Sequence, residues 1–169
     1  VGYTTMDGDS SGGLAPISGV DKSFILAWLV WMETQGPQND DGSRGPIPEL
    51  SVITAQAPTA ELRPKEAEQR DEDDLMPYPV LDAIEELYIR DRLAPQAVLD
   101  ALGGRFPGHA RVDLIAWVKR FYGLWVRNQW KRERIAPSFH LDDENLDPKT
   151  WCRYPILGGD WGDELGALE

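Results

Sequence analysis

The chain has 169 residues, a formal net charge of −12 at pH 7, 41% hydrophobic residues and seven tryptophans. This apolar content favours a folded domain over a disordered segment. The acidic balance argues against nucleic-acid binding, which needs a broad positive surface to gather phosphates. The longest apolar run, residues 24–32, is too short for a bilayer span of about 20 residues. With a single cysteine, Cys152, an internal disulfide is impossible, so a reducing cytoplasm is expected.

The first part of the chain predicts a loop, a helix and a second loop. Residues 1–20 are rich in Gly, Ser and Thr and are typical of a loop. Asp21 is a candidate N-cap for a helix that ends at Gly36-Pro37. That helix has one apolar face, made of Phe24, Ile25, Trp28, Leu29 and Met32. Residues 38–48 have a loop composition, and residues 50–54, "LSVIT", predict a short strand.

The middle of the chain, residues 56–79, predicts a long loop with at most short helical turns. It holds four prolines and a dense acidic run. Loops of this length in compact domains are often active-site lids. Two helices should follow, one over residues 80–90 that buries Leu81, Ile84, Leu87 and Tyr88, and one from Pro95 to Gly103-Gly104.

The longest predicted helix covers residues 110–134 and is followed by an irregular tail. Its core stripe is Leu114, Trp117, Val118, Phe121 and Trp125. On another face, Arg127, Lys131 and Arg134 follow at i, i+4 and i+7. The whole chain is therefore helix-rich, with no strand–helix alternation that would build a complete nucleotide-binding fold.

One basic segment, "WVRNQWKRERIAPS" (125–138), stands out in this acidic chain. Its cations are Arg127, Lys131, Arg132 and Arg134. A solvated helix end explains them, since cations suit a helix carboxyl terminus. Two nearby tryptophans suggest partial burial instead, and a partly buried cation needs an anionic partner such as a phosphate or carboxylate.

Other candidate sites have simple structural explanations. The glycine-rich stretch 9–22, which ends in Lys22, is either a phosphate-binding loop or a plain turn before a helix. The acidic runs 71–74 and 142–147 could bind Mg²⁺ but are more typical of solvated charge runs. His109 and His140 lack partners at zinc-ligand spacing, and Cys152 has no nucleophile signature.

Three stretches taken together resemble the NAD synthetase family. "VGYTTMDGDSSGGLAPISGVDK", "QAPTAELRP…QRDEDDLMPYPVLDAI" and "FYGLWVRNQWKRERIAPS" occur in the family's order. The tail "HLDDENLDPKTWCRYPIL" is similar to the glutamine-dependent bacterial form. The resemblance implies an α/β fold, the adenine nucleotide alpha hydrolase-like, Rossmann-like ATP pyrophosphatase, of which this chain is the helix-rich carboxyl-terminal portion. Residues 1–134 would be the carboxyl-terminal half of that synthetase domain, 56–79 its flexible lid, and 135–169 an irregular tail.

The resemblance also implies a reaction and partners. Family members adenylate the carboxylate of deamido-NAD with ATP and Mg²⁺, and ammonia then displaces AMP to give NAD, with pyrophosphate as the other product. In the glutamine-dependent form a nitrilase-like glutaminase domain of the same polypeptide makes the ammonia. The resemblance further implies a cytoplasmic amidotransferase that assembles as a homo-oligomer.

Seven residues match substrate-contacting positions of the family. For deamido-NAD these are Tyr3, Thr4, Thr5, Met6 and Lys131, and for ATP they are Lys22 and Thr59. No catalytic residue or metal ligand is expected in this segment, because the family's Mg²⁺ ligands precede it.

The chain departs from the family pattern in three places. Trp130-Lys131 stands where ammonia-dependent forms have His-Lys. Those forms also have an Asp near Gly13, a carboxylate that Asp7 or Asp9 would have to supply here. The S-G-G-x-D-S pyrophosphate loop is absent, so the chain alone is expected to be inactive. That absence leaves an alternative, a non-catalytic helical interaction or nucleotide-binding module.

Overall fold

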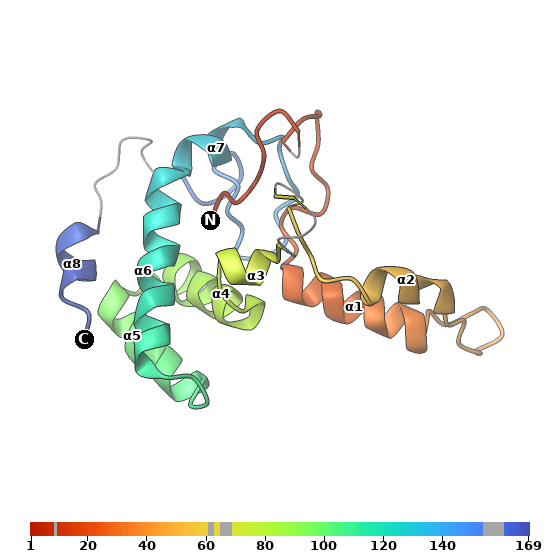
Figure 1. Ribbon diagram of the computed structural model, residues 1–169. Helices are drawn as coiled ribbons and strands as arrows, with labels where there is room; N and C mark the ends of the chain where they lie inside the picture. Colours follow the sequence, from red (N-terminus) through yellow and green to blue (C-terminus); the bar gives the residue numbers. More distant parts are fainter. Residues whose placement is uncertain (9, 61–62, 65–68, 154–160) are drawn as a thin grey trace. The chain divides into compact units, whose positions relative to one another are not determined.

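The computed structural model describes residues 1–8, 10–60, 63–64, 69–153 and 161–169 (Figure 1). The chain forms two compact units, one of residues 1–19 and 79–169 and the other of residues 20–78. Among the described residues there is no β-strand, and an isolated bridge between Gln38 and Arg44 is the sole extended pairing. The prediction of a helix-rich portion is confirmed.

The unit of residues 20–78 is built on α1, Lys22–Thr34. Asp21 occupies the predicted N-cap position, with extended backbone angles. Gly36, at φ +68°, ends the helix by donating its N–H to the carbonyl of Trp31. An L side chain there would meet the backbone of Gly45 at 2.0 Å, so the predicted stop at Gly36 has a clear steric basis.

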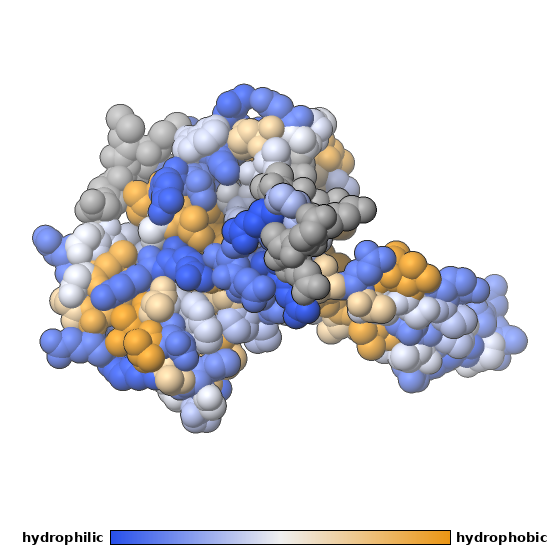
Figure 2. Space-filling model, in the orientation of Figure 1, coloured by the Kyte–Doolittle hydropathy of each residue, from blue (hydrophilic) through white to orange (hydrophobic). Residues whose placement is uncertain are grey.

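The apolar face of α1 does not form a core within this chain. In α1, whose residues are all described, none is buried, and Phe24 and Trp28 are 61% and 47% exposed. Figure 2 shows hydrophobic surface on the part of the molecule that contains α1 and α2. The amphipathic pattern thus predicted the helix correctly. It did not indicate whether the apolar face of the helix would be buried.

The predicted strand at 50–54 is wrong. A 3₁₀ turn, η1 (Pro48–Leu50), leads into one helical turn, α2 (Ser51–Thr54), and both contact α1. The hydroxyl of Thr54 donates to the carboxylate of Glu33 on α1 at 2.5 Å. This tertiary contact outweighs the β preference of Val52 and Ile53.

Among the described residues of the predicted loop at 56–79, the short helix α3 (Asp71–Asp74) agrees with the expected short turns, and α4 begins at Tyr78, inside the predicted loop. Residues 61–62 and 65–68 of this predicted lid lie outside the described part of the chain.

The unit of residues 1–19 and 79–169 holds the main core. Its elements are α4 (Tyr78–Glu85), the π-helical turn η3 (Glu86–Arg90), α5 (Pro95–Arg105), α6 (Arg111–Arg127), α7 (Gln129–Arg134) and α8 (Gly162–Gly166). Tyr88 is the centre of an aromatic cluster, with ring centroids 4.7 to 6.1 Å from its neighbours Phe121, Tyr122, Trp125 and Trp161. The predicted helices at 80–90 and 95–104 are confirmed, whereas Leu81 and Trp117 of the predicted core are only half-buried.

The predicted continuous helix at 110–134 is broken at Asn128. Asn128 has φ −99° and ψ 11°, so α6 ends at Arg127 and α7 begins at Gln129. Arg127 therefore lies on α6, whereas Lys131 and Arg134 lie on α7, so the three cations do not share one continuous helix as predicted. The tail also contains α8, which the sequence pattern did not predict, and residues 154–160 of the predicted irregular tail lie outside the described residues.

Candidate functional site

The amino-terminal segment lies against the junction of α6 and α7 (Figure 1). At the break, the side-chain amide of Asn128 donates to the carbonyl of Val1 at 3.0 Å. Gly2 adopts φ +70°, and a Cβ on it would lie 2.6 Å from Cβ of Asn128. Only glycine permits both the backbone angle and this close approach. The break in the helix is thus the place where the segment docks.

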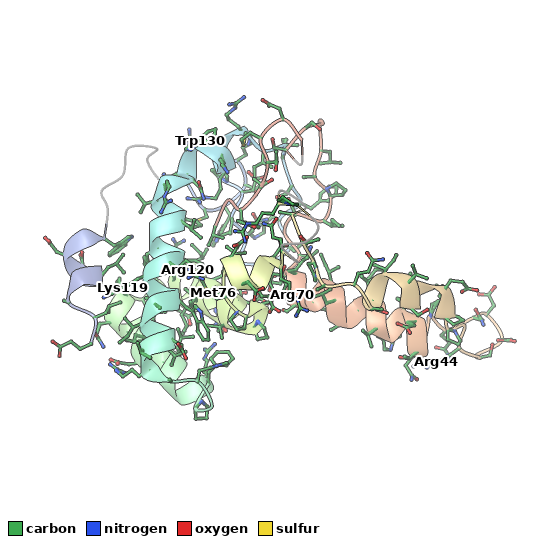
Figure 3. All side chains as sticks on the ribbon, viewed as in Figure 1. Arg44, Arg70, Met76, Lys119, Arg120 and Trp130 are labelled. Carbon is green, nitrogen blue, oxygen red and sulfur yellow. The ribbon has the colours of Figure 1, made fainter. Side chains whose placement is uncertain are left out.

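Lys131 is the second attachment of this segment. Its Nζ donates to the carbonyl of Thr4 at 2.9 Å, and the ammonium lies 5.9 Å from the centre of the Trp130 ring, labelled in Figure 3. An ammonium has three N–H groups, so this bond leaves two for a ligand. Tyr3, Thr4 and Met6 are half-buried beside α7, while Thr5 is exposed. The structure therefore brings together the two stretches predicted to bind deamido-NAD, which are far apart in the sequence.

Arg134, on the last turn of α7, lies near Asp7. The guanidinium and the Asp7 carboxylate are 3.6 Å apart, and both side chains are more than half exposed. The backbone N–H of Asp7 donates to the Ser10 hydroxyl at 2.9 Å, which holds Asp7 at φ +61°. Asp9, the other predicted carboxylate of this site, lies outside the described residues.

Arg132 differs from the other cations of the basic segment because it is 5% exposed. Its guanidinium stacks 3.6 Å from the centre of the Trp125 ring, and Nη2 donates to the Trp125 carbonyl at 2.8 Å. Burial lowers the pKa of Arg132 to about 10. The basic segment thus divides into an exposed Arg127, a buried Arg132 and two cations, Lys131 and Arg134, that face residues 4–7.

The loop after the amino-terminal segment is held by the tail. The N–H of Ala15 donates to the carbonyl of Pro137 at 3.0 Å, and a Cβ on Gly19 would lie 3.2 Å from the carbonyl oxygen of Phe139. Asn145 Nδ2 donates to the same Phe139 carbonyl at 2.9 Å. Residues 137–145 therefore support the end of this loop, residues 15–19.

Asp147 organises this support. Its carboxylate accepts hydrogen bonds from the N–H and hydroxyl of Ser138 and from the N–H of Lys149. Burial alone would raise the pKa of Asp147, but these hydrogen bonds hold the pKa below its usual value. Lys149 Nζ then donates to the carbonyls of Glu133 and Ile135, which caps the end of α7.

The residues predicted to contact ATP belong to the other unit. Lys22 is the first residue of α1, and Thr59 lies between α2 and α3. Both are exposed, as side chains that close on a bound nucleotide would be. Residues 3–6 and Lys131 belong to the unit of residues 1–19 and 79–169.

The acidic runs serve as hydrogen-bond acceptors within the chain. Asp74 accepts from Arg63 at 2.5 Å and from Gln69 at 2.8 Å, and Glu72 accepts from the N–H of Tyr78. In the described parts of the chain, no three His, Cys, Asp or Glu side chains are grouped so that they could hold a metal ion. None of the described helices is long and apolar enough to cross a membrane. Cys152 is buried, and burial raises the pKa of its thiol.

Comparison with known proteins assigns the family. The family model described as NAD synthase matches residues 1–121, about 70% of the chain. The chain belongs to the NAD synthase family. The match covers the unit of residues 20–78 in full and the other unit up to residue 121, so it contains Tyr3, Lys22 and Thr59 but ends before Lys131.

The NAD synthase relatives are longer proteins. Glutamine-dependent NAD(+) synthetases from Aquifex aeolicus (strain VF5) and Thermotoga maritima are 38% and 39% identical over 161 and 155 residues. These matches cover 95% and 92% of this chain but 22% and 23% of the relatives. The crystal structure of a glutamine-dependent NAD(+) synthetase from Cytophaga hutchinsonii matches with a TM-score of 0.74 and 42% identity, over 100% of this chain and 24% of that one. The chain thus spans about a quarter of the length of these proteins.

Sequence reasoning missed three residues of this arrangement. Gly2 and Asn128 fix the docking of the amino-terminal segment, and Arg132 is a buried polar anchor. Asn128 interrupts an otherwise helical pattern, which is a weak signal for a break. The seven-residue spacing of Trp125 and Arg132 places them on one helical face, which could have indicated the stacking.

Proposed function

We propose that this chain is part of a glutamine-dependent NAD synthetase and supplies its deamido-NAD contacts and lid. In this reaction the deamido-NAD carboxylate attacks the α-phosphorus of ATP, and pyrophosphate leaves. Ammonia, released from glutamine, then attacks the acyl-adenylate carbonyl, and AMP leaves to give NAD. The membership in the NAD synthase family and the names of the relatives support this proposal.

The observation that carries the proposal is the hydrogen bond between Lys131 Nζ and the Thr4 carbonyl. It joins two stretches that the family resemblance independently assigns to deamido-NAD. The bond holds the ammonium at the Thr4 carbonyl and leaves two of its N–H groups for other acceptors. A charge held in this way can bind the anionic groups of a dinucleotide without first losing side-chain freedom.

Lys22 and Thr59 would act on ATP. Negative charge gathers on the α-phosphorus and the leaving pyrophosphate during adenylation, and the Lys22 ammonium would stabilise it. Residues 56–79 would close over the site and exclude water, which otherwise hydrolyses the acyl-adenylate. By resemblance to the family, the ligands of the Mg²⁺ that accompanies ATP would come from other parts of the polypeptide.

We propose the remaining parts of the enzyme on the same basis, the membership in the NAD synthase family. The complete synthetase domain would have the adenine nucleotide alpha hydrolase-like fold, with residues 1–134 as its carboxyl-terminal half and 135–169 as the tail that supports it. A nitrilase-like glutaminase domain of the same polypeptide would provide ammonia, in a cytoplasmic homo-oligomer.

The test is product stoichiometry with the full-length polypeptide that contains this chain. Given deamido-NAD, ATP, Mg²⁺ and ammonium or glutamine, it should form NAD, AMP and pyrophosphate in equal amounts. AMP release should require deamido-NAD. A polypeptide that forms no NAD, or that binds ATP but releases no AMP when deamido-NAD is added, would refute the proposal.

A further inference from the structure

The helix that presents Lys131 has an unusual anchor. α7 has six residues, too few to be stable without tertiary contacts. All six are described, and the two that are buried, Gln129 and Arg132, are both polar. Trp130, the apolar residue of the helix, is 42% exposed. The orientation of α7 therefore depends on polar contacts, of which those of Arg132 are the most buried.

Arg132 connects α7 back to α6 across the break. Nη2 donates to the carbonyl of Trp125 in the last turns of α6, and the guanidinium plane covers the Trp125 ring. Trp125 is itself fixed, because it is 1% exposed and packs in the aromatic cluster around Tyr88. The contact thus ties α7 to the aromatic cluster of the core.

The burial of the Arg132 guanidinium costs free energy. Nη1 of Arg132 is buried without a hydrogen-bond partner among the described residues. An incompletely paired buried guanidinium is unfavourable compared with an apolar side chain of similar size. Burial also depresses its pKa, which reflects the same penalty. If this position needed only packing, a methionine side chain would fill it equally well.

We propose that Arg132 is a positioning residue for deamido-NAD: by clamping α7 to Trp125, it directs the ammonium of the adjacent Lys131 toward Thr4 and the substrate. This inference rests on the proposed function, since it acts through the lysine that the proposal assigns to deamido-NAD. Lys131 and Arg132 are neighbours on one turn of helix, about 100° apart. A rotation or shift of α7 would therefore move the ammonium away from its acceptors.

A double-mutant cycle in the full-length polypeptide tests this proposal. Arg132→Met keeps the length and packing of the side chain but removes its donors and charge. We expect it to raise KM for deamido-NAD about 10- to 50-fold, with KM for ATP changed less than about twofold. In a Lys131→Ala background, Arg132→Met should change KM for deamido-NAD by less than about twofold, because the group that it positions is already gone. Arg127→Ala, which removes an exposed cation from the same segment, is the matched control.

Arg132→Lys covers the case in which the methionine variant does not fold. It retains the charge and three N–H donors but lacks the planar guanidinium that stacks on Trp125 and donates from a fork, so a partial increase of KM for deamido-NAD, again absent in the Lys131→Ala background, is expected. Equal fold-changes in the two backgrounds, or an equal loss for both substrates, would overturn the positioning role. If Lys131→Ala alone leaves KM for deamido-NAD unchanged, the proposed function of Lys131 fails instead, which is a separate outcome.

Discussion

Lys131 and Thr4 are 127 positions apart in the chain and are joined by a hydrogen bond of 2.9 Å. The break at Asn128 lies at the same junction and supplies the side-chain amide that donates to the carbonyl of Val1. The cations of the basic segment therefore lie on both sides of a junction between two helices and not on one continuous helix. The four cations of this segment divide into an exposed Arg127, a buried Arg132, and Lys131 and Arg134, which face residues 4–7.

Gly2→Ala should disrupt the docking of the amino-terminal segment. The new Cβ would lie 2.6 Å from Cβ of Asn128, and φ +70° is unfavourable for alanine. Overpacking of this kind costs about 1–3 kcal/mol. We therefore expect KM for deamido-NAD to rise about tenfold, measured by steady-state kinetics of the full-length polypeptide.

Gly42→Ala provides the control for backbone strain. Gly42 has φ +83°, and its nearest neighbour to an added Cβ is 3.9 Å away. It should leave KM for deamido-NAD within about twofold of the wild-type value. A similar increase in both variants would mean that the close contact with Asn128 is not the cause.

Thr59→Val should slow adenylation. The substitution removes the hydroxyl and preserves the shape of an exposed side chain, so a lost hydrogen bond to ATP should reduce kcat/KM for ATP about five- to tenfold. Thr34→Val removes a hydroxyl that bonds within α1 and serves as the control. The measurement is the rate of pyrophosphate release in a single turnover, and an unchanged rate in Thr59→Val would contradict the assignment.

Asp147→Asn should loosen the tail in a pH-dependent way. The folded-state pKa of Asp147 is below the usual value of 3.8. The folded form thus binds fewer protons than the unfolded form as the pH falls, and the stabilisation present above about pH 4 is lost below it. At pH 7 the loss of charge-assisted bonds should be about 1 kcal/mol, or about fivefold faster hydrogen exchange of the Ser138 amide.

Asp142→Asn is the matched control for that experiment, since Asp142 is an exposed carboxylate of the same tail with one backbone hydrogen bond. It should not change the exchange of Ser138. If Asp147→Asn accelerates exchange equally at pH 7 and at pH 3, the carboxylate charge is not what holds the tail.

Most helices could be predicted because local signals mark their ends. Gly36-Pro37 stops α1, and Pro95 at the first helical position begins α5. The candidate site was proposed from resemblance, which named Thr4 and Lys131 but could not show that they touch. Their contact depends on a long-range docking that no local pattern encodes.

Three features were unpredictable for physical reasons. Residues 50–54 have strand propensity but fold as a helical turn because Thr54 bonds to Glu33 on α1. The break at Asn128 follows from its contact with Val1, and asparagine alone is only a weak helix breaker. Arg132 is buried because a planar guanidinium can cover Trp125, whereas a charged residue near a helix end is usually solvated.

Isothermal titration calorimetry of deamido-NAD with the full-length wild type, Lys131→Ala and Arg127→Ala decides whether Lys131 binds this substrate. Lys131→Ala should weaken binding by about 10- to 100-fold, as expected for a lost charge-assisted hydrogen bond. Arg127→Ala should bind within about twofold of wild type, and none of the variants should change the affinity for ATP. Equal affinities of wild type and Lys131→Ala for deamido-NAD would refute this role of Lys131.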